Sequence, residues 1–405
     1  MTTHYINIGQ LLQVRNPEKP LVGKDFNKLP YIENAYLSIN EKGLISGFGR
    51  MQDFTKTTHD KTIDVQGKIV MPAWIDSHTH LVFAASRADE FVDKINGLSY
   101  EEIAAKGGGI LNSAKKLMEI DENNLYKKSE ILLKEAIKYG TGAIEIKSGY
   151  GLSYEGELKM LRVIKKLKEN FNIPIKATFL GAHALPTDYS KEKYIDLLIN
   201  KLLPVIAKEK LADYIDVFCE KNYFTTDETS RILAAGRKYG LKPKIHANQF
   251  TSIGCIEKAV RHQAISVDHL EVIKENDLDV LRNSSTIATL LPGCSFFIDI
   301  PYAPTKELIK NNIPIALATD FNPGSTPTFN MNFIVSLGSI KMKLTPEQAI
   351  NSATVNAAFA LEIQKNYGSI SVGKKANFLI MKGYISHYNE IPYFFATNPV
   401  EKHIY

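Results

Sequence analysis

Short apolar runs alternate with amphipathic stretches between about residues 67 and 365. The apolar runs are rich in β-branched residues and nearly continuous in hydrophobicity, which is typical of parallel strands buried on both faces. The pattern predicts eight strands, at residues 69–77, 142–147, 175–181, 214–218, 243–247, 265–269, 286–291 and 314–319. Eight strands that alternate with helices predict an α/β fold, a (β/α)8 TIM barrel.

Helical signals occupy most of the segments between these strands. Residues 127–139 and 155–171 each place apolar side chains on one stripe of a helix. Residues 345–361 open with Thr-Pro-Glu-Gln, an N-cap and capping-box pattern with proline at the first helical position. Residues 81–126 are too long for one connection, so we expect an excursion beside the active site with one or two short helices.

The two ends of the chain have a different pattern. Residues 1–66 and 366–405 carry short strand signals interrupted by Gly, Asn and Pro. Neither end is long enough to bury a core alone, so we expect both termini to build one small β-sandwich domain. Residues 67–365 would then form the barrel domain.

Composition narrows the function classes. The chain has 405 residues, of which 44% are hydrophobic and 23% charged, and its net charge is +5. The charge is spread along the chain without a basic stripe, so we expect no nucleic-acid partner. The mild positive charge would help attract a small, anionic substrate, but only slightly. No apolar run approaches the length that spans a bilayer, and the N-terminal residues lack a signal-peptide pattern. We therefore expect no membrane association and a cytoplasmic location.

The three cysteines are Cys219, Cys255 and Cys294. They are odd in number, widely separated and without Cys-x-x-Cys spacing. We expect neither a disulfide framework nor a zinc ribbon from them, in keeping with a reducing compartment.

Candidate metal ligands lie where the predicted strands end. His78 and His80 follow the first strand and, because side chains alternate along a strand, point the same way. The later strands end in His183, His246, His269 and Asp320. Half of the ten histidines would thus lie at the rim where barrel active sites form, and the other five, expected at the surface or in structural roles, are His4, His59, His262, His387 and His403.

These motifs carry a resemblance to a known family. His-x-His on the first strand, single histidines on the fifth and sixth, and aspartate on the eighth resemble the amidohydrolase superfamily. The segments Ile146-Lys-Ser-Gly-Tyr-Gly-Leu152, Thr178-Phe-Leu-Gly-Ala-His-Ala184, Asp216-Val-Phe-Cys-Glu220 and Ala318-Thr-Asp-Phe-Asn-Pro-Gly-Ser325 are similar to the imidazolonepropionase family. The similarity extends from about Pro72 to Leu361.

The resemblance implies a reaction and a metal site. The family opens the imidazolone ring of 4-imidazolone-5-propanoate with water and gives N-formimidoyl-L-glutamate in histidine degradation. Lactams resist neutral water, and a divalent zinc ion can lower the pKa of water to about 7. The resemblance implies that His78, His80, His246 and Asp320 hold one Zn or Fe ion. It also implies that Asp320 accepts the proton of the water and that His269 polarises the carbonyl or orients the water.

The resemblance further implies a substrate site and a homodimer. Arg87 would bind the propionate carboxylate, for which a guanidinium fork is better suited than an ammonium. The other implied substrate contacts are Tyr150, His183, Gln249, Asn322, Gly324 and Ser325. The amide of Gln249 takes no proton, so its expected role is hydrogen bonding only.

Individual residues have structural alternatives. His183 and His269 could orient a metal ligand instead, Arg87 could be a solvated surface residue, and Tyr150 could be a packing aromatic. Glu145 and Lys147 could form a structural ion pair.

Other functions are compatible with part of the pattern. A cytosine or guanine deaminase would have a similar metal set, but Arg87 and the turn Lys147-Ser-Gly-Tyr150 favour a carboxylate-bearing imidazolone. A scaffold barrel without metal would not need the intact ligands. Glu220 lies where some superfamily members bridge two metals, but no candidate for a carboxylated lysine occupies that strand end.

Overall fold

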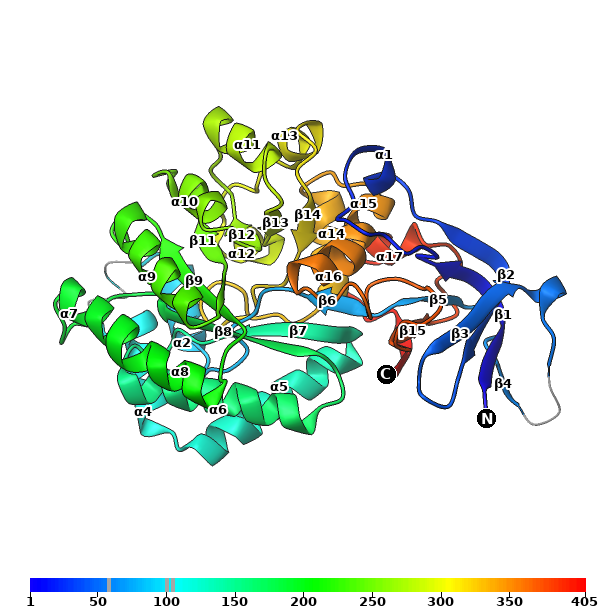
Figure 1. Cartoon of the computed structure of the whole chain (residues 1–405), viewed down its shortest axis with the longest axis horizontal. Coiled ribbons are helices and arrows are strands. Elements are labelled where there is room, and N and C mark those ends of the chain that lie inside the picture. The colour runs from blue at the N-terminus through cyan, green and yellow to red at the C-terminus, as the bar shows by residue number, and fades with distance from the viewer. Residues whose placement is uncertain (57–59, 99–101, 103–105) are drawn as a thin grey trace.

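The computed structural model of the chain describes residues 1–56, 60–98, 102 and 106–405. A large α/β part lies beside a smaller part dominated by strands, and the N-terminal and C-terminal strands both belong to the smaller part (Figure 1). His59, which we expected in a surface or structural role, lies outside the described residues, as do 99–101 and 103–105 of the predicted excursion.

Eight parallel strands form the large sheet. They are β6 (Trp74–Asp76), β7 (Thr141–Lys147), β8 (Ile175–Ala182), β9 (Tyr214–Cys219), β11 (Ile245–Ala247), β12 (Ser266–His269), β13 (Ile287–Leu290) and β14 (Ile315–Leu317), and a short strand, β10 (Lys242–Pro243), pairs with β9. A parallel bridge between Thr79 and Phe321 joins the first strand to the last, and His80 N donates to Phe321 O at 2.8 Å. The predicted TIM barrel is confirmed.

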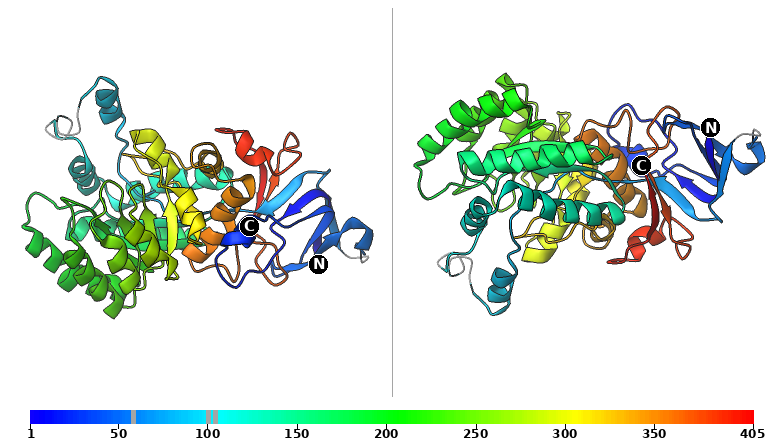
Figure 2. Two further views of the ribbon diagram at one scale, coloured as in Figure 1. Left: turned by 90° about the horizontal axis from the view of Figure 1, so that it is seen from above. Right: turned by 90° about the horizontal axis from the view of Figure 1, so that it is seen from below.

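Helices follow the strands around this sheet (Figure 2). Among the described residues they are α1 (Gly23–Phe26), α2 (Ala88–Ile95), α4 (Ile110–Glu119), α5 (Glu122–Lys138), α6 (Tyr154–Asn170), α7 (Lys191–Asp196), α8 (Leu203–Glu209), α9 (Thr226–Lys238), α10 (Cys255–Arg261), α11 (Glu275–Arg282), α12 (Pro292–Ile298), α13 (Thr305–Lys310), α14 (Met331–Ile340), α15 (Pro346–Asn351), α16 (Ala357–Ala360) and α17 (Glu390–Tyr393). Shorter helical turns are the 3-10 helix η1 (Met51–Asp53) and the π-helices η2 (Leu197–Leu202) and η3 (Ser352–Asn356).

Caps explain where the predicted helices begin. Helix α5 starts five residues before the predicted residue 127, because the Asp121 side chain accepts from Asn124 N. The predicted capping box of α15 is present, and its helix continues through η3 into α16. The predicted apolar stripe of α6, which includes Leu161 and Ile164, is fully buried. These helices therefore cover the barrel as their sequence pattern requires.

The smaller domain is one mixed sheet built from both ends of the chain. Its strands are β1 (Thr3–Leu12), β2 (Tyr31–Ile39), β3 (Ile45–Arg50), β4 (Lys61–Asp64), β5 (Ile69–Pro72), β15 (Phe378–Met381) and β16 (Val400–Ile404). Side chains from distant segments, such as Ile8, Leu37 and Phe378, share one apolar core. The small β domain predicted from the two termini is confirmed, and its strands belong to one hydrogen-bonded sheet.

One predicted strand is wrong in its extent. We expected residues 69–77 to form the first barrel strand, but β5 pairs with β1 and β15 in the small domain and only β6 belongs to the barrel. The break falls at Ala73, whose N–H donates to Asn377 O, whereas Trp74 N donates to Gly140 O. The chain therefore passes directly from one sheet to the other, and β6 ends where the candidate site begins.

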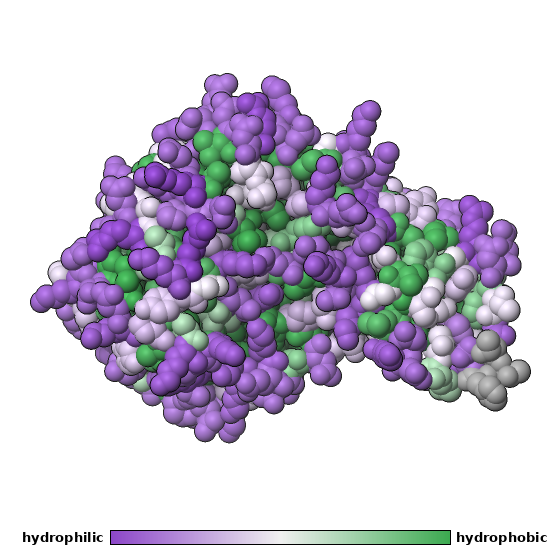
Figure 3. Space-filling model, in the orientation of Figure 1, coloured by the Kyte–Doolittle hydropathy of each residue, from purple (hydrophilic) through white to green (hydrophobic). Residues whose placement is uncertain are grey.

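The face shown in Figure 3 is largely hydrophilic, and hydrophobic residues gather over the small domain. In the described part of the chain, no helix combines the length and apolar character that crossing a membrane requires.

Candidate active site

Three histidines and one aspartate meet at the carboxyl ends of the barrel strands. His78 and His80 follow β6, His246 lies in β11 and Asp320 follows β14. The Nε2 atoms of His78 and His80 each lie 3.5 Å from Asp320 Oδ1. One nitrogen from each of the three buried histidines lies within 4.8 Å of the other two. The structure thus brings together the four residues predicted to bind metal.

The chemistry of these side chains fits a divalent cation. His78 Nε2 and His246 Nε2 are buried and have no hydrogen-bond partner in the described part of the chain, and His80 Nε2 lies beside Asp320. Burial lowers the pKa of all three histidines well below its usual value, so the rings are neutral and keep a lone pair. Neutral imidazole nitrogens together with a carboxylate form a donor set that suits Zn or Fe.

Two buried carboxylates contact the outer nitrogens of these histidines. His78 Nδ1 donates to Asp268 Oδ2 at 2.6 Å. His246 Nδ1 lies 2.9 Å from Asp216 Oδ2, close enough for an ion pair although not aligned as a hydrogen bond. Such carboxylates fix the tautomer and ring orientation of metal-binding histidines.

Asp320 is held by the loop that follows β14. Its Oδ2 accepts from Ser325 Oγ and Thr326 Oγ1, both at 3.2 Å, and its backbone oxygen accepts from Asn322 Nδ2 at 2.6 Å. Its φ is 55°, a left-handed conformation that non-glycine residues adopt mainly where surrounding structure enforces it. Burial raises the pKa of Asp320 to about 6, and a bound cation beside it would lower that pKa.

His269 differs from the three candidate ligand histidines, because its surroundings raise its pKa instead of lowering it. It ends β12 with a φ of 91°, and its Nδ1 lies 3.3 Å from Glu271 Oε1. Burial opposes its charge, but the nearby carboxylates of Glu271, Asp320 and Asp268 outweigh burial and raise its pKa. A group that stays protonated nearer to neutral pH is suited to donate a hydrogen bond at this end of the site.

A cavity of about 570 Å³ opens beside the histidines, and all seven residues predicted to bind substrate line it. They are Arg87, Tyr150, His183, Gln249, Asn322, Gly324 and Ser325. A smaller cavity of about 60 Å³ is lined by several of the same residues together with His80, His246, His269 and Asp320. The predicted substrate residues and metal ligands therefore share one pocket system.

Arg87 lies at the N-cap of α2 and points into this cavity. Its Nε donates to Ser113 Oγ at 2.9 Å, and its guanidinium carbon lies 5.7 Å from the centre of the Tyr150 ring. A Cβ on Gly324 would lie 2.4 Å from Arg87 Nη1. Glycine is therefore required if the guanidinium is to pack against the turn after β14.

Asn322 organises that turn. Its Oδ1 accepts from Gly324 N at 2.8 Å and from Ser325 N at 2.7 Å, while its Nδ2 donates to Ser325 Oγ at 2.8 Å. The Asn322 side chain therefore links the turn to Asp320, whose backbone oxygen it also contacts.

Tyr150 and His183 also line the cavity of about 570 Å³. The His183 ring stacks on His80 with centroids 5.2 Å apart, and its Nδ1 donates to Gly149 O at 3.1 Å. Burial lowers the pKa of His183 to about 4, so the ring is neutral and its Nε2 is an acceptor. Burial also raises the pKa of the Tyr150 hydroxyl, which therefore remains a donor.

Sequence reasoning missed several buried polar groups around this pocket. Asp216 lies inside a quoted motif without an assigned role, and Asp268, Lys244 and Glu271 were given no role either. Charged residues within otherwise apolar barrel strands were the available signal, because alternate strand positions face the barrel interior. The contact between Glu145 and Lys147, predicted as a structural ion pair, is present at 2.7 Å.

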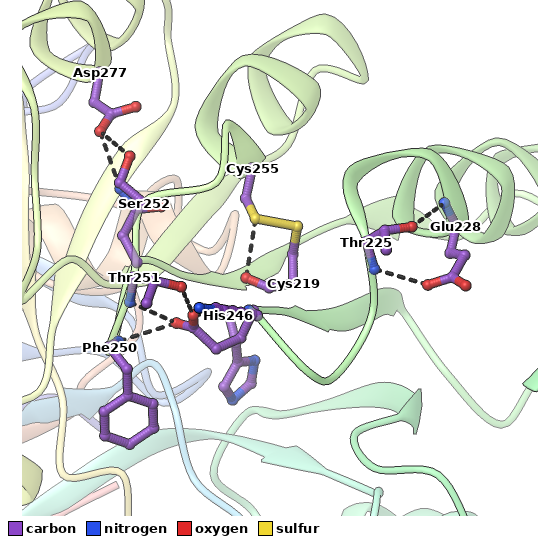
Figure 4. Close-up of a disulfide and its surroundings, with 12 residues drawn as sticks. Cys219, Thr225, Glu228, His246, Phe250, Thr251, Ser252, Cys255 and Asp277 are labelled. Atoms are coloured by element: carbon purple, nitrogen blue, oxygen red, sulfur yellow. Dashed lines mark hydrogen bonds between the residues drawn. A yellow bond between two sulfur atoms is a disulfide. The ribbon is translucent and has the colours of Figure 1, made fainter.

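Cys219 and Cys255 form a disulfide with Cα atoms 6.0 Å apart, so the expectation of no disulfide framework among the cysteines was wrong (Figure 4). Cys219 ends β9, and pairing of β11 with β9 brings the start of α10 beside that end. Cys294 remains free and buried.

Glu220, next to the disulfide, holds the loop after β11. Its carboxylate accepts from Phe250 N at 3.0 Å, from Thr251 N at 3.2 Å and from the Thr251 hydroxyl. Figure 4 shows Phe250 and Thr251 on the segment between His246 and Cys255. Glu220 is thus engaged by the segment that carries Gln249.

Comparison with known proteins gives consistent matches. The profile of the amidohydrolase family matches residues 69–404. An imidazolonepropionase of Flavobacterium johnsoniae is 56% identical over 404 residues, which cover 99% of this chain and 98% of that protein. An imidazolonepropionase of Christiangramia forsetii is 54% identical with the same coverage, and one of Streptococcus pyogenes serotype M12 is 38% identical over 99% of this chain and 95% of that protein.

Solved structures share the fold at low identity. Guanine deaminase of E. coli superposes with a TM-score of 0.75 at 13% identity, covering 100% of this chain and 97% of that one. The 5-methylcytosine deaminase of Klebsiella pneumoniae gives 0.73 at 15% identity, covering 99% and 95%. These likenesses support the barrel with its small β domain and carry no information on substrate.

Proposed function

This chain belongs to the imidazolonepropionases of the amidohydrolase family, and from that premise we propose which of its residues carry the reaction. The enzymes hydrolyse a carbon–nitrogen bond of a cyclic amide: they open the ring of 4-imidazolone-5-propanoate with water to give N-formimidoyl-L-glutamate in histidine degradation. The proposal concerns the metal, the proton transfers and the substrate contacts.

His78, His80, His246 and Asp320 would hold one Zn or Fe ion. The observation that carries this assignment is the approach of His78 Nε2 and His80 Nε2 to Asp320 Oδ1, each at 3.5 Å, beside the third buried imidazole of His246. When bound, such an ion acts as a Lewis acid and makes hydroxide available near neutral pH. A single ion is favoured because Glu220, the candidate bridge to a second one, is engaged by backbone N–H groups of the next loop.

Asp320 would accept a proton in the reaction, and His269 would donate a hydrogen bond. Asp320 accepts the proton of the attacking water, since its Oδ1 lies among the ligand nitrogens while Ser325 and Thr326 hold its Oδ2. With Nδ1 directed to Glu271, His269 has Nε2 free to donate to the ring carbonyl as negative charge develops on its oxygen.

The cavity residues would fix the substrate. Arg87 binds the propionate carboxylate through charge-assisted hydrogen bonds. Tyr150 donates to the substrate and His183 accepts from a ring N–H, in agreement with the protonation that burial imposes on each. Gln249 contributes a hydrogen bond but no proton transfer. Asn322, Gly324 and Ser325 shape the turn that contacts the substrate or product.

Three further proposals concern the domains, the oligomeric state and the location of the protein. We propose a domain division into 1–66 with 366–405 and 67–365, with the first boundary moved to about residue 73 because β5 belongs to the small-domain sheet. We also propose a homodimer in solution and a cytoplasmic location. Light scattering of the purified protein tests the dimer, since a molar mass near that of one chain would exclude it.

One experiment distinguishes this function from that of a nucleobase deaminase and from a metal-free scaffold. Purified enzyme is mixed with the imidazolone and loss of near-ultraviolet absorbance is followed, with cytosine and guanine as parallel substrates and metal content measured on the same sample. Rapid loss of the imidazolone and about one metal per chain support the proposal. Turnover of a nucleobase alone would assign a deaminase, and a metal-free, inactive protein would assign a scaffold.

A further inference from the structure

Five charged side chains are buried together beside the candidate metal ligands. They are Glu145, Lys147, Asp216, Lys244 and Asp268, each at most 1% exposed, and we call them the Lys147 network. They come from β7, β9, β12 and the segment between β10 and β11. None of them belongs to the residues assigned above to metal or substrate.

The ammonium group of Lys147 touches the two carboxylate oxygens that face the ligand histidines. Its Nζ lies 2.8 Å from Asp216 Oδ2 and 3.4 Å from Asp268 Oδ2. The same Oδ2 atoms lie 2.9 Å from His246 Nδ1 and 2.6 Å from His78 Nδ1. One cation therefore connects two carboxylates that each contact a different histidine.

The remaining contacts of these carboxylates also restrain their rotation. Asp216 Oδ1 accepts from His246 N at 3.1 Å and from Val217 N at 2.7 Å. Asp268 Oδ1 accepts from Ser266 Oγ at 2.5 Å. Because a buried carboxylate is unfavourable without a cation in contact, loss of Lys147 would remove the one ammonium that touches both groups, and their positions would change.

We propose that Lys147 is a positioning residue for metal binding, whose single ammonium group holds the two carboxylates that orient His78 and His246. The inference rests on the ligand set proposed above. Disturbing the partners of metal-binding histidines typically weakens metal affinity by about 10- to 100-fold. A loss in this range is expected when Lys147 is removed, although Lys147 is not among the residues proposed to hold metal or substrate.

Lys244 provides a matched control. It is also fully buried and also pairs with Glu145, but among the described residues it forms no ion pair with Asp216 or Asp268. The test compares Lys147→Met/Glu145→Gln with Lys244→Met/Glu145→Gln. Each double variant removes one ammonium and one carboxylate, so the net buried charge stays that of the wild type.

Zinc affinity is measured on the metal-free full-length proteins by competition with a chromophoric chelator, and the visible spectrum of the Co²⁺-loaded proteins reports ligand geometry. We expect the Lys147 variant to lose about 10- to 100-fold in affinity and to change its Co²⁺ spectrum, and the Lys244 variant to stay within about threefold. Equal losses in both variants, or no loss in either, would overturn the inference. If wild-type protein itself bound no zinc, the proposed function would fail first, so the two failures are distinguishable.

A second measurement covers the case in which the Lys147 variant does not fold. The isosteric changes Asp216→Asn and Asp268→Asn, alone and combined, keep the lysine in place. Because both carboxylates share one cation, their effects on zinc affinity should be coupled, and the combined variant should deviate at least about threefold from the product of the single losses. Independent, multiplicative losses would overturn the role of Lys147.

Discussion

The turn after β14 offers a direct test of how Arg87 is used. A Cβ added to Gly324 would lie 2.4 Å from Arg87 Nη1 and 3.2 Å from Cζ. Favourable non-bonded contacts need about 3.5 Å, so Gly324→Ala requires the guanidinium to retreat by about 1 Å. Gly324 is not among the positive-φ glycines, and the atom in the way is the end of a flexible side chain. Alanine should therefore displace Arg87 without disturbing the fold.

The expected change in KM follows from the hydrogen bond that Arg87 would lose to the substrate carboxylate. A hydrogen bond to a charged group contributes about 1.5–3 kcal/mol, and each 1.4 kcal/mol is about a factor of ten. We therefore expect Gly324→Ala to raise KM by about 10- to 100-fold. The bond from Arg87 Nε to Ser113 Oγ at 2.9 Å resists the retreat, so the effect should not exceed that of Arg87→Ala. The substitution leaves the metal ligands in place, and kcat should change much less than KM.

Steady-state kinetics with the imidazolone, followed in the near ultraviolet, measures both constants. Gly47→Ala is a matched control, since an added Cβ there meets no atom within 4 Å and the backbone conformation is ordinary. In Arg87→Ala/Gly324→Ala the clash disappears, so the double variant should behave like Arg87→Ala. A wild-type KM for Gly324→Ala, or multiplicative losses in the double variant, would refute the role given to Arg87.

Other groups give predictions of different kinds. Asp320→Asn should stay folded by circular dichroism and lose about 10²- to 10⁴-fold in kcat, since an amide accepts no proton. Because burial raises the pKa of Asp320 to about 6 in the metal-free protein, protons compete with metal below that pH. Zinc affinity should fall as pH drops through about 6, and a flat calorimetric profile between pH 5 and 8 would contradict Asp320 as a ligand. Glu157 accepts three backbone N–H groups of residues 149–152, so Glu157→Gln should lower the free energy of unfolding by about 1–3 kcal/mol in urea and raise KM. Reducing the disulfide, which spans 36 residues, should lower stability by about 3–4 kcal/mol in urea, an effect absent from Cys219→Ser/Cys255→Ser.

The convergence of the candidate metal ligands could be predicted from the sequence, because the barrel fold brings the ends of its strands together. His78, His246 and Asp320 are far apart along the chain, but each lies in or just after the last residues of a strand, and parallel strands end at one rim. The helix at residue 345 was predictable for a local reason, since its capping box is complete within four residues.

Features decided by pairing between distant segments were not predictable. The run 69–77 gives no sign that β5 pairs with β15, because apolar residues continue without interruption from Ile69 to Ile75 across the break at Ala73. The disulfide depends on β11 lying beside β9. For the Lys147 network, the sequence shows charged residues in strands but not which of them face the same interior.

The barrel closes through a contact between residues that are far apart along the chain, so closure depends on how much of the chain has been synthesised. His78 O accepts from Asp320 N at 3.0 Å, so two candidate ligands lie on the joint between the first and last strands, 242 residues apart. No ribosome-bound fragment lacking β14 can present the full donor set, and such long-range pairing forms late in folding. The proposed four-ligand set would therefore be complete only after β14 has been synthesised, and a chain truncated before Asp320 should bind zinc more weakly than the full chain.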